Sequence, residues 1–120
     1  MNKATENLKY HQEWLENLAC LFLDYNHIDK AIALWEALDC VKPGDARVIG
    51  SLGYAYLEKQ RYEDAVKMGE RFLATVQDDK RGKGAGVIYL ILSRAYFGLG
   101  MTELAKQYMS KHLGEKSESV

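Results

Sequence analysis

The stretch LGYAYLEKQRYEDAVKMGERFL, residues 52–73, carries two apolar stripes at helical spacing on either side of a short polar break. Apolar residues that recur every three or four positions form one face of an α-helix. Two helices joined by so short a connection pack side by side and run in opposite directions. The stretch therefore predicts an antiparallel pair of helices, with Gly53, Tyr56 and Ala65 on the faces that meet.

Stretches of the same kind fill the rest of the 120-residue chain. Short polar joints separate them, the alternation of apolar and polar residues typical of strands is missing nearly everywhere, and Pro43 is the only proline. This pattern predicts an all-α fold in one domain. The expected helices span about residues 5–24, 29–41, 46–58, 62–76, 85–98 and 102–113.

Residues suited to ending or starting a helix stand at several of the joints. Asn26 and Gly100 lie just past expected helix ends, where a left-handed backbone is commonly needed. Pro43 and Gly44 stop the second helix, and the carboxylate of Asp45 can cap the third. The six helices are therefore expected to form three pairs with tight turns.

The three pairs are similar to one another in sequence. Ala31 and Ala65 lie 34 residues apart, each near the start of the second helix of its pair, and Ala105 follows 40 residues later because QDDKRGKG (77–84) adds length. Small residues at such positions let two helices approach closely, and aromatic residues fill the space around the contact. The matching small residues of the first helices are Ala19, Gly53 and Ser93, and the aromatic ones are Phe22, Tyr56 and Tyr96.

Gly69 departs from this pattern. The corresponding position in the middle of the second helix is Trp35 in the first pair and Met109 in the third. A glycine inside a helix costs about 1 kcal/mol relative to alanine. We therefore expect a close neighbour or a local bend at Gly69.

These features resemble the tetratricopeptide repeat, whose 34-residue pattern runs W-x₂-L-G-x₂-Y, then A-x₃-F, then P. The resemblance covers about residues 12–118, although the final proline is absent from the second and third repeats. It implies three tandem helical hairpins stacked into a short right-handed solenoid. The single domain, residues 1–120, would comprise an N-terminal helix extension at 5–11, repeats at about 12–45, 46–79 and 86–118, and a polar tail at 114–120.

Composition and charge exclude several classes of function. Apolar residues make up 48% of the chain and charged residues 28%, as in a folded protein. The net charge of −1 gives no footprint for nucleic acid or an anionic membrane, and no apolar run approaches the roughly 20 residues that span a bilayer. The N-terminus lacks the apolar stretch of a secretory signal, so we expect a cytoplasmic protein whose Cys20 and Cys40 are free thiols.

No catalytic constellation stands out in the sequence. The glycines of GKGAG, residues 82–86, do not form a phosphate-binding loop pattern and follow no strand, so a loop between repeats is expected there. His11, His27 and His112 are not spaced to share a zinc ion. We therefore expect no enzyme activity, no cofactor and no metal.

The resemblance also implies a binding surface, because set positions on the first helices of tetratricopeptide repeats line a concave groove. Those positions are markedly apolar in this chain, as in sites that bind a protein. Aliphatic and aromatic anchors suit an amphipathic helix or an extended apolar segment. The expected groove residues are Cys20, Leu23, Arg47, Tyr54, Leu57, Val87, Leu90, Arg94 and Phe97. Two alternatives stay open: some of these residues are core, or the N-terminal segment or a second copy of the chain covers the groove.

In size, in its three compact repeats and in its apolar concave face, the chain is similar to the small tetratricopeptide-like chaperones of bacterial type III secretion. The telling segments are LGYAYLEKQRYEDA and LSRAYFGLGMTELAKQY. The resemblance implies a chaperone of the bacterial cytoplasm that keeps an apolar helical segment of a secretion component soluble before export. A general scaffold, a module of a larger assembly, and a homodimer of the partner-free protein stay open as alternatives.

Overall fold

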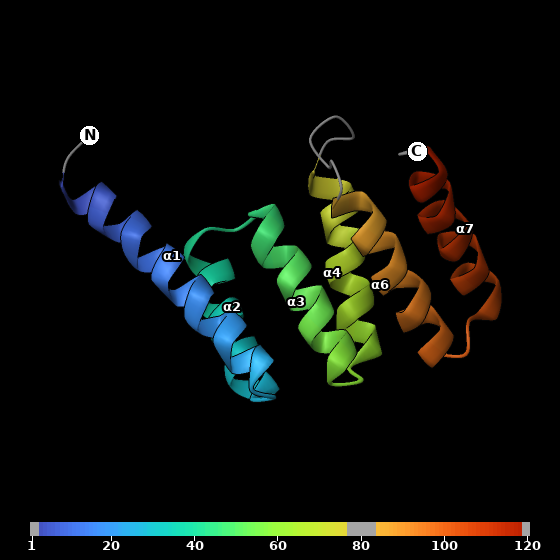
Figure 1. Cartoon of the computed structure of the whole chain (residues 1–120), viewed down its shortest axis with the longest axis horizontal. Helices are drawn as coiled ribbons and strands as arrows, with labels where there is room; N and C mark the ends of the chain where they lie inside the picture. Colours follow the sequence, from blue (N-terminus) through green and yellow to red (C-terminus); the bar gives the residue numbers. More distant parts are fainter. Residues whose placement is uncertain (1–2, 77–83, 119–120) are drawn as a thin grey trace.

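The computed structural model of this chain describes the backbone of residues 3–76 and 84–118 and the side chains of residues 11–76 and 84–114. All regular structure in these ranges is α-helical, which confirms the all-α part of the predicted fold (Figure 1). The helices are α1 (Lys3–Asp24), α2 (Ile28–Val41), α3 (Ala46–Glu58), α4 (Tyr62–Thr75), α6 (Gly84–Gly98) and α7 (Thr102–Glu118).

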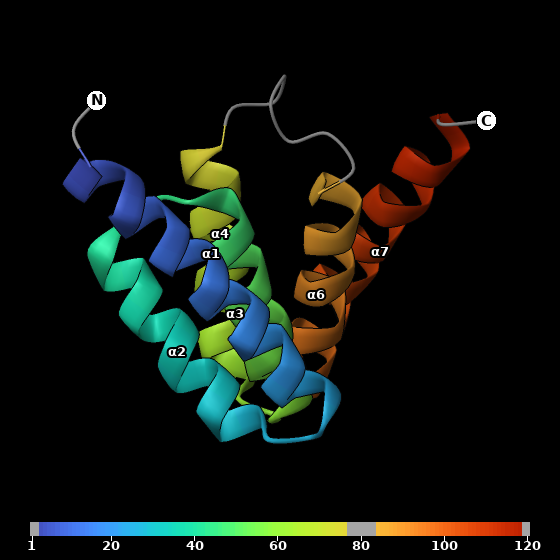
Figure 2. The ribbon, with the colours of Figure 1, turned by 60° about the vertical axis from the view of Figure 1, so that its left-hand side comes forward.

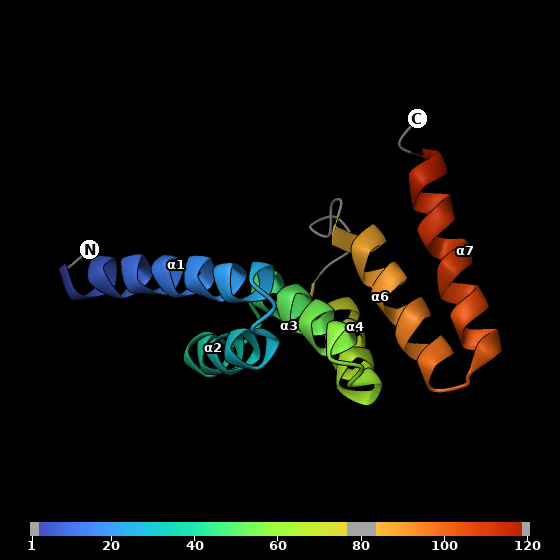
Figure 3. The same ribbon diagram turned by 60° about the horizontal axis from the view of Figure 1, so that its bottom comes forward.

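The helices follow one another along the molecule in the order of the chain. The most extensive contacts join α1 to α2, α3 to α4 and α6 to α7, which we call the first, second and third pairs. The two helices of each pair run in opposite directions (Figure 2). Helix α2 also packs on α3, and α6 packs on both α4 and α3, so the pairs are arranged along the 49 Å long axis. Figure 3 shows α6 and α7 steeply inclined to α1 and α2.

The turn within each pair has the same backbone geometry. A residue with positive φ, between 63° and 79°, ends each first helix. The N–H of the next residue then donates to the carbonyl five positions earlier, at 2.7–2.9 Å. This geometry confirms the prediction for Asn26 and Gly100, and it occurs in the second pair at Gln60, which the sequence did not single out. The residues with positive φ are Asn26, Gln60 and Gly100.

The connection between the first two pairs also forms as expected. Gly44 has a φ of 88°, a value that favours glycine. The side chain of Asp45 accepts a hydrogen bond from the backbone N–H of Arg47 at 3.0 Å, which satisfies one of the free donors at the start of α3.

Two helices extend into segments that the sequence predicted as a loop or a tail. Helix α6 begins at Gly84, so the last three residues of GKGAG are helical; Gly82 and Lys83, with the rest of residues 77–83, lie outside the described residues. Helix α7 continues to Glu118, through most of the polar tail predicted at 114–120. That segment contains no proline, and its Glu and Lys residues are good helix formers, so its polarity did not end the helix.

Small residues bring the helices of each pair close together. Ala31 and Ala65 are 0% exposed, and a Cβ atom on Gly53 would lie 3.4 Å from the Cβ of Met68 on α4. In the third pair the hydroxyl of Ser93 donates to the carbonyl of Ala105 at 2.8 Å, which places the two backbones side by side. The predicted close contacts at small residues are therefore present.

Gly69 on α4 fits against the third pair. A Cβ atom at Gly69 would lie 2.6 Å from Cγ and Cδ2 of Leu92 on α6, a distance that packed atoms do not reach. Leu92 is itself 0% exposed, so it has little space into which to move. The close neighbour expected at Gly69 is confirmed, and the glycine sets how near α4 and α6 can approach.

We predict that Gly69→Ala destabilises the protein although alanine is the better helix former. The overlap with Leu92 should cost about 1–3 kcal/mol, which exceeds the gain in helix propensity of about 1 kcal/mol. Gly114→Ala is the matched control, because a Cβ atom there meets nothing within 4 Å. Urea unfolding followed by circular dichroism measures both; a Gly69→Ala variant as stable as Gly114→Ala would contradict this packing.

Buried or half-buried tyrosines link consecutive pairs through carboxylates. The hydroxyl of Tyr56 on α3 donates to Glu36 on α2 at 2.9 Å. The hydroxyls of Tyr96 and Tyr108 in the third pair both donate to Glu70 on α4, at 3.1 and 3.0 Å. Burial is the main cause that raises the pKa of Tyr56 to about 12, and the hydrogen bond to the Glu36 carboxylate raises it further.

This pKa predicts a loss of stability at alkaline pH. The folded-state pKa of Tyr56 lies above the ordinary value of 10, so folding favours the neutral phenol. The contribution of Tyr56 to the free energy of unfolding is therefore complete below pH 10 and is lost as the pH rises towards 12. Tyr56→Phe should cost about 1.5 kcal/mol of unfolding free energy at pH 9, and this difference should shrink by pH 12. Urea unfolding of both proteins across this pH range tests the link. A difference independent of pH would contradict it.

Candidate protein-binding groove

A cavity of about 640 Å³ lies between α1, α3 and α6, and we call it the central groove. Its floor contains buried side chains from α2, α4 and α6, namely Trp35, Phe72 and Ile88. Small residues on α3 and at the start of α6 also line the groove. The complete lining is Cys20, Leu23, Trp35, Ala46, Arg47, Gly50, Ser51, Tyr54, Phe72, Gly84, Val87 and Ile88.

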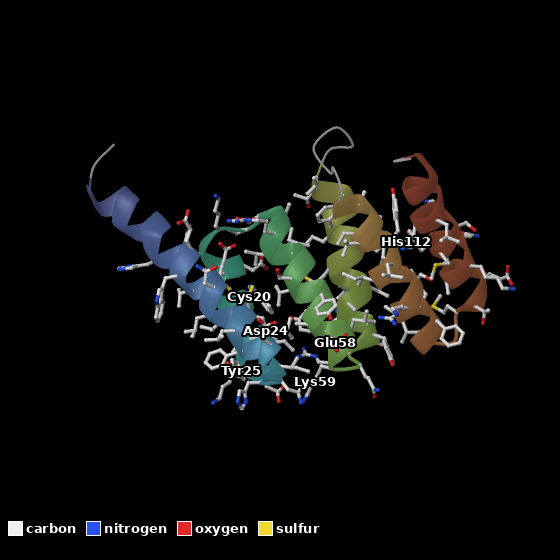
Figure 4. The ribbon with its side chains drawn as sticks, in the orientation of Figure 1. Cys20, Asp24, Tyr25, Glu58, Lys59 and His112 are labelled. Atoms are coloured by element: carbon white, nitrogen blue, oxygen red, sulfur yellow. The ribbon has the colours of Figure 1, made fainter. Side chains whose placement is uncertain are left out.

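A second cavity of about 530 Å³ lies towards the other end of α3 and α6, and we call it the end pocket. It is formed by the C-terminal half of α6, the start of α4 and one face of α7, with the end of α3. Figure 4 labels Cys20 on α1, which lines the central groove, and Glu58 on α3, which lines the end pocket. The lining of the end pocket is Leu57, Glu58, Gln60, Tyr62, Ser93, Arg94, Phe97, Thr102, Ala105, Lys106 and Met109.

The structure distributes eight of the nine predicted groove residues over these two cavities. Leu90 lines neither and lies half-buried between them on α6. Seven residues separate Val87 from Arg94 on that helix, a rise of about 10 Å. The central groove holds Cys20, Leu23, Arg47, Tyr54 and Val87, and the end pocket holds Leu57, Arg94 and Phe97.

The predicted residues differ in how accessible they are. Tyr54 is 42% exposed, Val87 54% and Phe97 71%, so their side chains are available for contact. Leu23 and Leu57 are half-buried and pack against the core, so they also contribute to the fold. The role of the nine residues in binding a partner stays a prediction.

Sequence reasoning missed the floor of the central groove. Trp35 and Phe72 read as core positions of their helices, and they are indeed only 2% and 4% exposed. They nevertheless line the cavity, together with the small residues Gly50 and Ser51 of α3. The only available signal was the pair of small residues at the start of α3.

The described lining of the central groove carries little charge. Among the described residues Arg47 is the one charged residue in the lining, and its guanidinium forms an ion pair with Glu16 on α1 at 3.1 Å. The Arg47 side chain is largely exposed, so the pair contributes at most about 1 kcal/mol to stability. A ligand of this groove would meet apolar and aromatic surface, with charge only at the rim.

The thiol of Cys20 is held in its neutral form. Burial raises its pKa above the ordinary value of 9.0, and the nearby carboxylates of Asp24 and Glu16 raise it further. A thiol with a raised pKa is a poor nucleophile at neutral pH, since the thiolate is the reactive form. Cys20 therefore acts as a small apolar part of the groove wall.

The described part of the chain shows no metal-binding cluster and no membrane-spanning helix. Within it no three His, Cys, Asp or Glu side chains are close enough together to hold a metal ion. His112 lies buried in the third pair, with Nδ1 2.8 Å from the carbonyl oxygen of Gly86. None of the described helices is both long and apolar enough to cross a membrane.

Comparisons with known proteins identify no relative. A scan against models of protein families gives no match to the chain, and a search of curated protein sequences gives no significant one.

The environment of Cys20 predicts its rate of alkylation. In a Cys40→Ser variant the reaction of Cys20 with iodoacetamide should have its midpoint above pH 9, because the folded state holds the thiol neutral. The same variant in 6 M guanidinium chloride should react with a midpoint at lower pH. Asp24→Asn should lower the folded-state midpoint. Equal midpoints in the folded and unfolded protein would contradict the raised pKa of Cys20 in the folded state.

Proposed function

We propose that this chain is a chaperone that binds an apolar or amphipathic helical segment of another protein in the central groove. The observation that supports this most directly is the lining of the groove, which combines the buried floor of Trp35 and Phe72 with the exposed Tyr54 and Val87. Hydrophobic and aromatic anchors around a groove suit the apolar face of a helix. Its near absence of charge favours an apolar ligand over an acidic or basic peptide.

We further propose that the three helix pairs form a tetratricopeptide-like solenoid. Three facts support this: the pairs follow one another along the long axis, they share one turn geometry, and they place small residues at matching positions. In such a solenoid the first helices of the repeats line the concave side. The central groove lies between α1, α3 and α6, the first helices of the three pairs.

The mechanism is stoichiometric binding. Burial of apolar surface contributes about 25 cal/mol per Å², and ordering the bound segment and losing its free motion oppose this gain. A segment with an apolar face would aggregate or assemble early if left in water. Covering that face in the groove keeps the segment soluble until another reaction removes it.

The proposal that the ligand is a type III secretion component is based on the sequence resemblance. The size of the chain, its three pairs and its apolar groove fit a dedicated cytoplasmic chaperone of that system in a bacterium. The alternative is a general tetratricopeptide scaffold. Large apolar side chains exposed away from the groove favour it, and they include Trp14 at 58%, Leu21 at 49% and Val41 at 58%.

Two valines provide a matched test of the proposed function. Val87 lines the central groove and is 54% exposed, whereas Val41 lies at the end of α2, outside both cavities, and is 58% exposed. Val87→Glu should reduce partner binding about tenfold or more, because it places a charge in a desolvated contact. Val41→Glu should leave binding unchanged.

Affinity capture from the source cells, with quantitative mass spectrometry, measures this difference. The wild type should retain one dominant small partner, which Val87→Glu loses and Val41→Glu keeps. Circular dichroism melting checks that both variants are folded. Several partners retained equally by all three proteins would favour the scaffold, and the chaperone proposal would then be wrong.

A further inference from the structure

One face of α1 is exposed although the same face of α3 and α6 is buried. Trp14 and Leu21 on this face are 58% and 49% exposed, and Leu18 between them is half-buried. The pairs repeat after 34 residues and then after a further 40. The residues of α3 and α6 that correspond to Trp14, Leu18 and Leu21 therefore stand 34 and 74 positions later in the chain. These six residues are all at most 3% exposed: Val48, Leu52, Ala55, Ile88, Leu92 and Ala95.

The preceding helix pair covers this face in both later helices. Helix α3 packs on α2, and α6 packs on α4 and α3, where Leu92 sits against Gly69. In the described part of the chain no helix pair precedes α1. Its apolar stripe, which we define as Trp14, Leu18 and Leu21, therefore lacks the cover that the corresponding residues have.

The opposite end of the molecule carries the positions that correspond to the receiving surface of the second pair. Gly50, Gly53 and Gly69 of the second pair are the positions that receive Ile88, Ile91 and Leu92 of α6. Forty residues later the third pair has Leu90, Ser93 and Met109, on which no described pair lies; Ser93 is buried, and Leu90 and Met109 are half-buried. Ser93 and Met109 line the end pocket, beside Phe97, which is 71% exposed.

The first pair is acidic and the third pair slightly basic. Residues 3–45 contain eight carboxylates and four lysines, whereas residues 84–118 contain three carboxylates and four lysines or arginines. Arg94 and Lys106 line the end pocket together with Glu58. Arg94 makes no ion pair within the described part of the chain, and Lys106 makes only a 3.9 Å one with Glu103. The basic end thus suits the acidic first pair of another molecule.

We propose that a second copy of this chain docks its α1 stripe onto the end pocket, so that two molecules stack end to end. The contact continues the packing that already joins α2 to α3 and α4 to α6, and it pairs the acidic end of one copy with the basic end of the next. A symmetric contact between two α1 stripes would instead bring two acidic pairs together. A head-to-tail contact leaves a free face at each end, so it extends into open oligomers as the concentration rises.

Sedimentation velocity of the purified chain at increasing concentration tests the proposal. The mean mass should rise above that of a monomer, and added salt should reduce it because the ends attract through charge. Leu21→Glu at one end and Phe97→Glu at the other should each weaken association about 30-fold or more, as for loss of a buried interface anchor. Both residues are about half or more exposed, so the variants should fold; Met109→Glu provides a second variant of the end pocket.

A mixture of the two variants distinguishes the head-to-tail contact from a symmetric contact. Leu21→Glu retains an intact end pocket and Phe97→Glu retains an intact α1 stripe, so an equimolar mixture should form a dimer and nothing larger. If Phe97→Glu and Met109→Glu each still self-associate, and the mixture forms no additional dimer, the contact is a symmetric one between α1 stripes. That result would overturn the proposal. A wild type that stays monomeric at all concentrations would overturn it as well.

Discussion

The close approach of helices at small residues is the constraint on which the rest of the structure depends. Ala31 and Ala65 are wholly buried, and Ser93 donates to the backbone of Ala105, so the two helices of a pair touch almost backbone to backbone. Gly69 extends the same principle to the contact between pairs, since Leu92 occupies the space of its missing side chain. Close packing of this kind fixes the angle between helices, and it therefore fixes which faces remain uncovered.

The cavities follow from this packing. Each pair covers one face of the next pair, and the first helices α1, α3 and α6 line a shared groove. Its lining combines the small residues Gly50 and Ser51 with the buried Trp35 and Phe72. The two ends of the array have no neighbour among the described residues, and there the faces that would be internal in a longer array are left exposed. The cavities and the exposed end faces thus have one physical origin.

Much of the fold could be predicted because its signals are local. Asn26, Gly100 and Asp45 are residues whose chemistry suits one position in a turn or cap, and they occupy it. Gln60 adopts the same left-handed backbone without such a preference, so only the comparison of the three turns reveals it. The division of the expected groove into two cavities could not be predicted, since it depends on how steeply α6 crosses α3. Helical periodicity carries no information about that angle.

The central claim is that the groove around Tyr54 holds a segment of a protein partner. The most direct test places a photo-cross-linking amino acid at Tyr54 and, in a separate variant, at Val41, and irradiates the living source cells. Tyr54 lines the central groove, and Val41 is similarly accessible but lies outside it. The account predicts one dominant cross-linked partner from position 54 and none from position 41. No product from position 54, or the same products from both positions, would contradict it.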